Sequence, residues 1–375
     1  MGMNITSKAN VIVLYNYYKT WKPEEYQDAL RLLNVLVDGL RQLGHRVQPI
    51  EFWKDVKPAL EGYNPDEWII FQWVEGIEDE IGGDARITAE LDAMGWTYTG
   101  NPPSALKLSV EKGKVKKVLE RWRIPTPAGQ EFKSADEVDA WHATTNTAGL
   151  FPAIVKPVSQ HCSAGVTRDA VVHNVDQLRA RVAFVIDQFK EAALVEKFIE
   201  GREINVGIWG NGRPRLLPLR EIDFSAVQDP LRRMVTWDSK WVPDSEEWNS
   251  IPVITQPAIS DALRAHIEDI ALKTYRAFDC RDYARVDLRV DANEQAFVVD
   301  VNPNPDICYD GGFAGACNAA GFTYAQAVSN IIGMAVTRRN RRNTLLNTLR
   351  KLRAEEMKPQ PARARSRRVA VAVPA

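Results

Sequence analysis

Charged and amide side chains alternate with apolar residues in two neighbouring segments, RVDLRVD from residue 285 and FVVDVNPN from residue 297. In a strand, alternate side chains lie on one face, so Arg285, Asp287 and Arg289 share a face. By the same rule Asp300 and Asn302 share a face of the second segment, and an antiparallel hairpin would make the two faces coincide. Two carboxylates and an amide oxygen are suitable ligands for Mg²⁺. The pattern predicts a magnesium site, with Arg285 as a cation for a developing phosphoryl charge.

A second set of charged residues lies around the end of another apolar segment, LVEKFIEGRE from residue 194. Glu196 could accept a hydrogen bond from an adenine amino group, and the backbone of the connector after it could pair with the ring edge. Glu203 could accept from ribose hydroxyl groups. This pattern predicts a nucleoside site, and an exposed strand end is the alternative interpretation.

Lysines that could neutralise phosphate groups occur in two upstream segments. Lys156 ends the apolar run IVKP, where its ammonium can reach nucleotide phosphates. A helix face offers a second cation, for which we choose Lys116, with three neighbouring lysines as alternatives: Lys112, Lys114 and Lys117. A solvated helix face would also account for this second group.

The first hundred residues alternate between predicted strands and helices. The strands are expected at residues 11–15, 47–52 and 68–73, and the helices at residues 23–44 and 87–94. Pro23 at the first turn and Gly44 at the end are typical helix boundaries. The alternation favours an open, mostly parallel α/β sheet that ends near the turn at residues 99–103.

The remaining chain reads as a small α+β unit followed by a strand-rich part. The small unit is expected to hold a helix from 104 to about 123, strands at 153–156, 170–173 and 193–197, and a helix at 175–189. The later part is expected to hold strands at 204–209, 216–224, 283–290 and 296–301, and helices at 260–278 and 324–336. The predicted fold class is therefore α/β combined with α+β.

Composition places the chain among ordinary globular proteins, with 375 residues, 45% hydrophobic residues and a net charge of −1. No run of 18 apolar residues and no apolar signal core occurs, so we expect a cytoplasmic protein with no membrane partner. The four cysteines show no zinc spacing and are expected to be reduced thiols. The phosphate-binding motif GxxxxGK[ST], the dinucleotide-binding motif GxGxxG and the zinc-binding motif HExxH are absent from the sequence.

Positive charge is concentrated at the end of the chain, where residues 337–375 contain 12 Lys/Arg and two Glu. A basic tail can contact nucleic acid. Because no aromatic residue is interleaved with these charges, we expect instead a solvated helix end and a disordered tail, with no nucleic-acid partner.

Taken in order, these motifs resemble the ATP-grasp superfamily, and within it the chain is similar to D-alanine–D-alanine ligases from about residue 11 to residue 336. The motifs that carry the resemblance are the lysine helix, IVKP, VEK with Glu203, Arg285-x-Asp287 and Asp300-x-Asn302. The resemblance implies an N-terminal Rossmann-like α/β domain (1–103), a central lid domain (104–192), a C-terminal antiparallel-sheet domain (193–336) and a basic tail (337–375).

The resemblance also implies a role for each matched residue. Lys116, Lys156 and Ser163 of the loop at 158–165 would contact the phosphates of ATP, and Lys240 would reach the γ-phosphate from a mobile loop. The adenosine site would be formed by Glu196, Lys197, Ile199 and Glu203. A Mg²⁺ pair, for which Mn²⁺ is an alternative, would be bound by Asp287, Asp300 and Asn302. Arg285 would stabilise an acyl phosphate formed from a carboxylate, which an amine then converts to an amide.

Departures from the family concern mainly the substrates. The middle metal ligand is Asp300 where the family has Glu, and the phosphate loop contains His161 and Cys162 with a single Gly. Glu25 falls where the ligases hold the ammonium group of the first substrate, and a solvated helix-start Glu is an equal alternative. Gly311 and Trp241 replace a Ser and a Tyr that contact the second substrate. We therefore expect small-molecule carboxylate and amine substrates other than D-alanine pairs.

Two other functions stay open at this point. One is authentic D-alanine–D-alanine ligation, and the other is a catalytically silent ATP-binding scaffold. All four residues of the metal and arginine set are present in the sequence, which favours the enzyme. By resemblance alone, a homodimer is also open.

Overall fold

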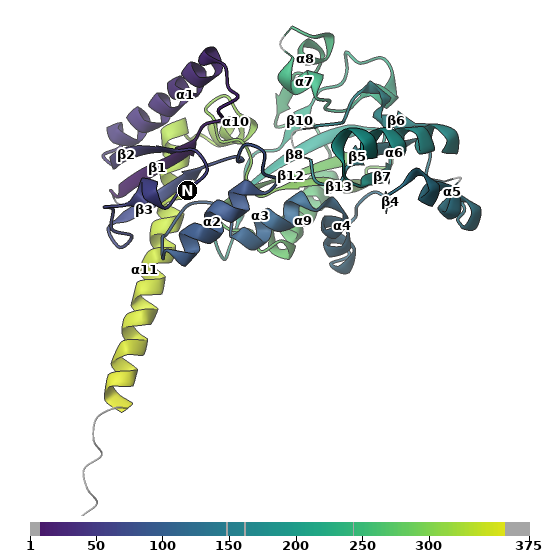
Figure 1. Cartoon of the computed structure of the whole chain (residues 1–375). Helices are drawn as coiled ribbons and strands as arrows, with labels where there is room; N and C mark the ends of the chain where they lie inside the picture. Colours follow the sequence, from purple (N-terminus) through teal and green to yellow (C-terminus); the bar gives the residue numbers. More distant parts are fainter. Residues whose placement is uncertain (1–7, 148, 161–162, 243, 357–375) are drawn as a thin grey trace, which may run out of the picture. The chain divides into compact units, whose positions relative to one another are not determined.

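The computed structural model describes residues 8–147, 149–160, 163–242 and 244–356. The chain divides into a compact unit of residues 1–336 and a second unit of residues 337–375. The strands of the first unit form three sheets of three, six and four strands (Figure 1).

The three-stranded sheet is parallel and has the order β2-β1-β3, which confirms the predicted open α/β sheet. Its strands are β1 (Asn10–Asn16), β2 (Arg46–Phe52) and β3 (Trp68–Trp73), and its helices are α1 (Pro23–Gln42) and α2 (Gly83–Ala93). Alternate residues of β1 face opposite sides, so Val11 and Val13 join a core with α1, whereas Ile12 and Leu14 join a core with α2. Burial of both faces explains the apolar runs in the sequence.

The four-stranded sheet is antiparallel and has the order β4-β7-β5-β6. It consists of β4 (Gly129–Phe132), β5 (Ala153–Pro157), β6 (Val171–Val172) and β7 (Ala193–Lys197), with helices α5 (Ala135–Thr144) and α6 (Val175–Phe189). Because β7 pairs with both β4 and β5, the predicted boundary between residues 192 and 193 is wrong: it would cut this sheet.

The six-stranded sheet holds the predicted metal hairpin at its edge, in the order β11-β10-β8-β12-β13, with β9 paired to β8. Its strands are β8 (Arg202–Trp209), β9 (Arg215–Leu216), β10 (Arg220–Ile222), β11 (Val253–Thr255), β12 (Tyr283–Val290) and β13 (Ala296–Asn302). Helix α9 (Asp261–Ala277) contacts β8, β12 and β13 (Figure 1). The single strand predicted over residues 216–224 is wrong: it is interrupted between β9 and β10, where Pro218 has no N–H for a ladder.

Two helix predictions are also wrong. The helix expected from 104 to 123 is two helices, α3 (Pro103–Val110) and α4 (Lys112–Arg121), because Glu111 between them has the non-helical dihedrals φ −100° and ψ 76°. The helix expected to end at residue 336 is α11 (Tyr324–Glu356), so residues 337–356 are helical and not disordered. Residues 357–375 of the predicted tail lie outside the described residues.

The remaining short helices are α7 (Asp238–Trp241), α8 (Glu246–Ser250) and α10 (Gly312–Ala319), with 3₁₀ turns at Pro58–Leu60, Arg168–Ala170 and Pro230–Arg232.

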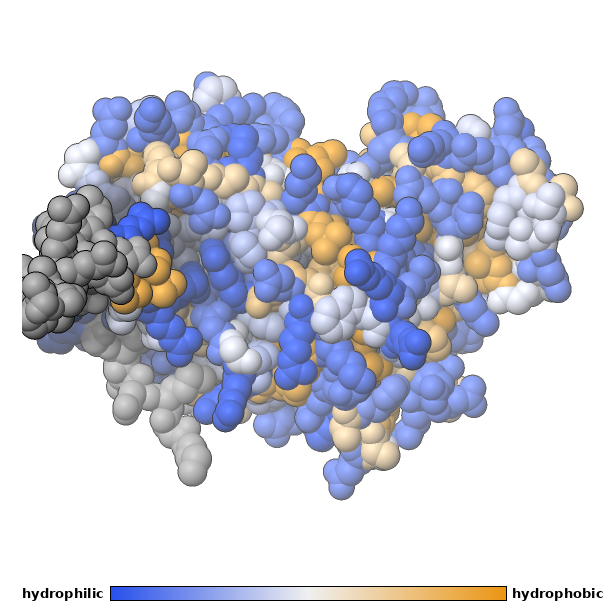
Figure 2. All heavy atoms as spheres, turned by 90° about the horizontal axis from the view of Figure 1, so that it is seen from below, coloured by the Kyte–Doolittle hydropathy of each residue, from blue (hydrophilic) through white to orange (hydrophobic). Residues whose placement is uncertain are grey.

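The surface view in Figure 2 shows a face on which hydrophilic residues predominate and hydrophobic residues form small separate patches. The large apolar side chains are collected instead in four buried clusters. Among the described residues, no helix combines the length and the apolar character that a membrane span needs.

One buried amide joins the parallel sheet to the metal hairpin. Asn101 follows the turn after the first domain, and its Nδ2 donates to the carbonyls of Tyr283 and Pro303 at 2.6 and 2.5 Å. Its Oδ1 accepts from the Arg281 N–H at 2.7 Å. Asn101 is only 2% exposed, so water cannot replace these partners. This residue therefore connects both ends of the hairpin to the N-terminal sheet.

Replacing Asn101 by Ala should destabilise the protein by at least about 2 kcal/mol, because it leaves three buried backbone groups without partners. Urea unfolding followed by fluorescence measures the change. Asn318→Ala on the exposed side of α10 is the control, with an expected change below about 0.5 kcal/mol. Equal stability of the two variants would contradict the assignment.

Glu78 anchors the segment between β1 and α1 in a similar way. Its carboxylate accepts from the N–H and hydroxyl of Thr20 at 2.9 and 2.7 Å, the N–H of Lys19 at 3.2 Å and the Trp53 indole at 3.1 Å. These hydrogen bonds, led by that of the Thr20 hydroxyl, lower the pKa of Glu78 to about 2.

A carboxylate whose pKa is lowered by folding stabilises the protein above its unfolded pKa of about 4.3 and loses that contribution as the pH falls toward 2. The stability difference between wild type and Glu78→Gln should therefore be full at pH 7 and shrink steadily from pH 4 to pH 2.5. Urea midpoints measured across this range test it. A difference that does not depend on pH would show that the charge of Glu78 contributes nothing.

Candidate active site

A cavity of about 1140 Å³ lies among the three sheets and is lined by most of the predicted site residues. This volume accommodates a nucleotide together with a second small molecule. The predicted residues that line it are Lys156, Ser163, Glu196, Lys197, Ile199, Glu203, Lys240, Arg285, Asp287, Asp300 and Asn302. Two predicted residues, Glu25 and Lys116, do not line it.

The strands β12 and β13 form an antiparallel hairpin in which Asp287 lies opposite Asp300 and Arg285 opposite Asn302, so the two predicted faces coincide. A bulge follows directly after the Asp287–Asp300 pair, and Val299 is the residue left out of the register. Asp287 is 7% exposed, yet it lines the cavity. The side-chain oxygens of Asp287, Asp300 and Asn302 form a hard-oxygen donor set, which suits Mg²⁺.

Arg285 is held in place by a two-pronged ion pair with Asp287, at 2.7 Å from Nε and 2.9 Å from Nη2. Asn205 from β8 donates to the same carboxylate at 2.9 Å. Burial alone would lower the pKa of Arg285, but the nearby carboxylates of Asp287 and Asp300 outweigh it and raise the pKa. A permanent positive charge therefore lies beside the metal ligands.

Two lysines share one buried carboxylate at the boundary of the four-stranded sheet. Glu196 accepts from Lys116 at 2.6 Å and from Lys156 at 2.5 Å, and only 3% of Glu196 is exposed. Burial alone would raise the pKa of Glu196, but the two ammonium groups lower it. Both carboxylate oxygens are thus engaged by cations, which differs from the predicted hydrogen bond to adenine.

The surroundings of Lys116 do not fit the phosphate contact that we predicted for it. Its ammonium also donates to the Pro127 carbonyl at 2.5 Å and is buried away from the large cavity. The break before α4 instead places Lys112 in the cavity lining, where its ammonium contacts the Val158 and Gln160 carbonyls of the phosphate loop. Burial lowers the pKa of Lys112 to about 8. Lys112, one of the alternatives named in the sequence analysis, is therefore the better candidate for the phosphate contact.

The predicted nucleoside site contains a residue to which the sequence assigned no role. Arg289 donates to the Ile199 carbonyl at 3.0 and 2.8 Å and contacts Glu203 at 3.3 Å. It lies over the rings of Phe198 and Phe224 at 5.4 and 5.5 Å from their centres. Alternation along β12 placed Arg289 on the active face, and that signal could have identified it.

The segment after β10 brings Lys240 and two tryptophans to the cavity wall. Lys240 lies on α7, and the rings of Trp237 and Trp241 are 5.9 Å apart, with both side chains partly exposed. Ser163 lines the cavity from the phosphate loop in a left-handed conformation with φ 63°. His161 and Cys162 of that loop lie outside the described residues.

Glu25 is not a site residue in the structure. Its carboxylate accepts from the Lys22 N–H at 2.7 Å, which closes a capping box at the start of α1. The solvated helix-start alternative is therefore the correct one.

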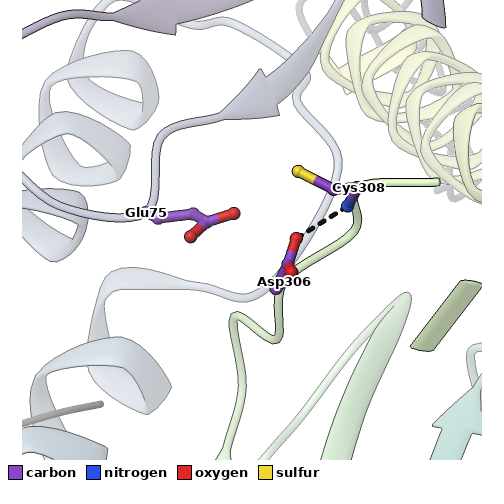
Figure 3. A group of neighbouring side chains, drawn as sticks. All are labelled: Glu75, Asp306 and Cys308. Carbon is purple, nitrogen blue, oxygen red and sulfur yellow. Dashed lines mark hydrogen bonds between the residues drawn. The ribbon is translucent and has the colours of Figure 1, made fainter. Parts of the chain in front are cut away.

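Acidic residues that the sequence analysis missed occupy another part of the cavity wall (Figure 3). Glu75 follows β3, and Asp306 and Cys308 follow β13, with one ligand atom of each residue within 4.8 Å of the others. Burial, followed by the charge of Asp306, raises the pKa of Glu75 to about 8. Burial raises the pKa of Asp84, in the first turn of α2, to about 6. Glu75 and Asp306 lie on loops, so no periodic pattern marks them.

Comparison with known proteins identifies relatives of the chain. The family model described as "D-ala D-ala ligase C-terminus" matches residues 119–333. The chain is 30% identical to an uncharacterized protein, y4sG, of Sinorhizobium fredii over 81% of this chain and 87% of that protein. It is also 30% identical to the D-alanine–D-alanine ligase of Desulforudis audaxviator over 84% and 95% of the two chains.

Solved structures share the fold. The D-alanine–D-alanine ligase from Bacillus anthracis complexed with ATP superimposes with a TM-score of 0.67 at 21% identity, covering 89% of this chain and 99% of that one. The VanG D-Ala:D-Ser ligase from Enterococcus faecalis gives 0.67 at 16% identity, covering 88% and 100%. The sequence motifs, the three sheets and these matches agree, and the chain belongs to the D-alanine–D-alanine ligase family of ATP-grasp enzymes, which are ATP-dependent carboxylate–amine ligases.

Proposed function

We propose that the protein uses MgATP to activate a small carboxylate and joins it to an amine other than D-alanine. The observation that carries this proposal is the register of β12 and β13, which collects two carboxylates, an amide and an arginine on one wall of the cavity. Loss of any of these groups would be expected in a silent scaffold.

ATP would bind with its adenine ring against the connector after β7. The Ile199 N–H meets no acceptor among the described residues and lies at the cavity, so it can pair with the ring edge. Glu203 would accept from the ribose hydroxyls, while Arg289 positions both Glu203 and the Ile199 carbonyl. Lys197 would contribute its backbone carbonyl.

The phosphates would lie between the lysines and the loop that contains Ser163. Lys112 and Lys156 would contact them directly, and Lys116 would act indirectly by holding Glu196. Lys240 would reach the γ-phosphate from α7. Asp287, Asp300 and Asn302 would bind Mg²⁺ or Mn²⁺, which when bound neutralises the charge of the transferred phosphoryl group.

The reaction would proceed in two balanced steps. An oxygen of the carboxylate attacks the γ-phosphorus, the bond to the β-phosphate oxygen breaks, and ADP leaves. The amine nitrogen then attacks the carbonyl carbon of the acyl phosphate, phosphate leaves, and the nitrogen loses a proton. Arg285 would stabilise the negative charge that develops on the oxygens in both steps, because its charge is fixed beside the metal ligands.

Substrates other than the D-alanine pair are supported by the second-substrate side of the cavity. Gly311 has no hydroxyl group, and a Cβ at this position would lie 2.9 Å from the Asp306 carboxylate. Trp241 provides a partly exposed ring with no hydroxyl at the opposite lid position. The relatives named for D-alanine–D-alanine and D-Ala:D-Ser ligation make those two products the alternatives to test.

The three-domain division also remains a proposal, with β7 moved to the central domain, and so does a homodimer. Small-molecule substrates are the partners that this function requires.

Substituting Asp300 by Asn should reduce phosphate release from MgATP at least about 100-fold with any productive substrate pair, because the metal loses an anionic ligand. Asp38→Asn on the exposed face of α1 is the matched control and should keep full activity. Turnover of Asp300→Asn at the wild-type rate would refute the metal assignment.

Substitutions of the two candidate phosphate-binding lysines, Lys112 and Lys116, should have different effects. Lys112→Gln should raise KM for ATP about 10-fold, because a charge-assisted contact is lost at the cavity, and should lower the melting temperature less than Lys116→Gln does. Lys116→Gln should instead lower the melting temperature, because it removes a buried partner of Glu196. Lys114→Gln, which changes an exposed lysine on the same helix, serves as the control for both. If Lys116 contacted the phosphates instead, Lys116→Gln would raise KM for ATP and Lys112→Gln would not.

A further inference from the structure

Three carboxylates form what we call the acidic end of the cavity: Glu75, Asp84 and Asp306. They come from the loop after β3, the first turn of α2 and the loop after β13. Among the described residues, none of the three forms an ion pair with Lys, Arg or His. The acidic end therefore lacks the protein cations that neutralise the buried carboxylates Glu196 and Asp287.

The acidic end is part of the reaction cavity and not a separate surface cluster. Asn304 donates to Asp84 at 3.2 Å, and its N–H donates to Asn302 at 2.9 Å, so one residue connects the acidic end to a metal ligand. When a substrate reacts at the metal site, the part of it next to the reacting group therefore lies beside these carboxylates. The family reaction supplies such a molecule, because one of its substrates is an amine.

A hydroxyl group near Asp306 also has no partner among the described residues, although Tyr324 itself does not line the cavity. The Tyr324 hydroxyl is buried without a hydrogen-bond partner among the described residues, and its pKa is raised by burial and then by the neighbouring Cys308 and Asp306.

Burial and then the charge of Asp306 raise the pKa of Glu75, so a cation beside these two carboxylates would favour the ionised form of Glu75. A positively charged ligand also supplies hydrogen-bond donors to several oxygens at once. A neutral alkyl group would leave the carboxylates uncompensated. The charge of the cavity wall therefore selects among amine substrates.

We propose that the acidic end binds a positively charged amino or guanidino group, so that the acceptor is a basic amino acid or a diamine whose second nitrogen carries out the attack. This inference rests on the proposed ligase function. A divalent cation held by Glu75, Asp306 and Cys308 is the competing occupant.

The test compares substrates that share a carbon skeleton and differ in whether they carry a terminal ammonium group. Phosphate release from MgATP by the full-length protein is measured with D- and L-lysine against D- and L-norleucine, and with 1,5-diaminopentane against pentylamine. Each is offered alone and together with a panel of D- and L-amino acids as the carboxylate. The charged member of at least one pair should give a kcat/KM at least ten-fold above that of its neutral partner.

In Asp306→Asn and Glu75→Gln, the ratio of kcat/KM between the charged and the neutral member should fall at least ten-fold, while KM for ATP stays unchanged. The Asn side chain can still accept from the Cys308 N–H, which Asp306 binds at 2.7 Å, so the fold is expected to survive. Asp79→Asn is the matched control, since Asp79 lines the same cavity but already lies 3.6 Å from Lys54. This control should keep the full preference.

The outcomes separate this proposal from the ligase function on which it rests. Stimulation by neutral amino acids, with no gain from the cationic member of any pair, would leave the ligase standing and overturn the acidic-end assignment. If no mixture stimulates release, the ligase function fails, and calorimetry with lysine and diaminopentane then decides the acidic end alone. Binding that is lost in Asp306→Asn supports it, whereas absent binding, or binding of Mn²⁺ alone, overturns it.

Discussion

The register between β12 and β13 is the constraint on which the rest of the site depends. One residue of slip would turn Asp300 and Asn302 to the opposite face and separate them from Asp287 and Arg285. Pairing of β12 with β8 along its whole length fixes the strand on its other side, so the hairpin cannot shift alone. The bulge comes after the acidic pair, so the pairing of Arg285, Asp287, Asp300 and Asn302 stays regular.

Several charged side chains near this hairpin are in contact with an opposite charge. Glu196 lies between two lysines, Asp287 pairs with Arg285, and Arg289 pairs with Glu203. Such pairs contribute little net stability, since burial of each ion opposes its attraction to the partner. Their effect is positional: each holds a side chain at the cavity wall in one orientation. The same residues therefore shape the cavity wall and form the candidate active site.

Much of this arrangement could be predicted from local patterns. Alternation along two strands predicted the hairpin and its face, and period and boundary residues predicted α6 and β7 to the residue. The break at Glu111 could not be predicted, because the helical pattern continues through it, and the sequence alone did not separate Lys112 from Lys116. The acidic end was missed for a different reason. Glu75 and Asp306 are 231 positions apart and lie on loops, so only the folded chain places them together.

The hydrogen bonds of Asn101 also impose an order on folding. They join residues that are 182 and 202 positions apart in the chain. The parallel sheet, by contrast, is complete within the first hundred residues. During synthesis that sheet can therefore form early, but its connection to the hairpin must wait until residue 303 has been made. Until then the polar end of the first sheet stays open to water, and the emerging chain has no cavity in which ATP could bind.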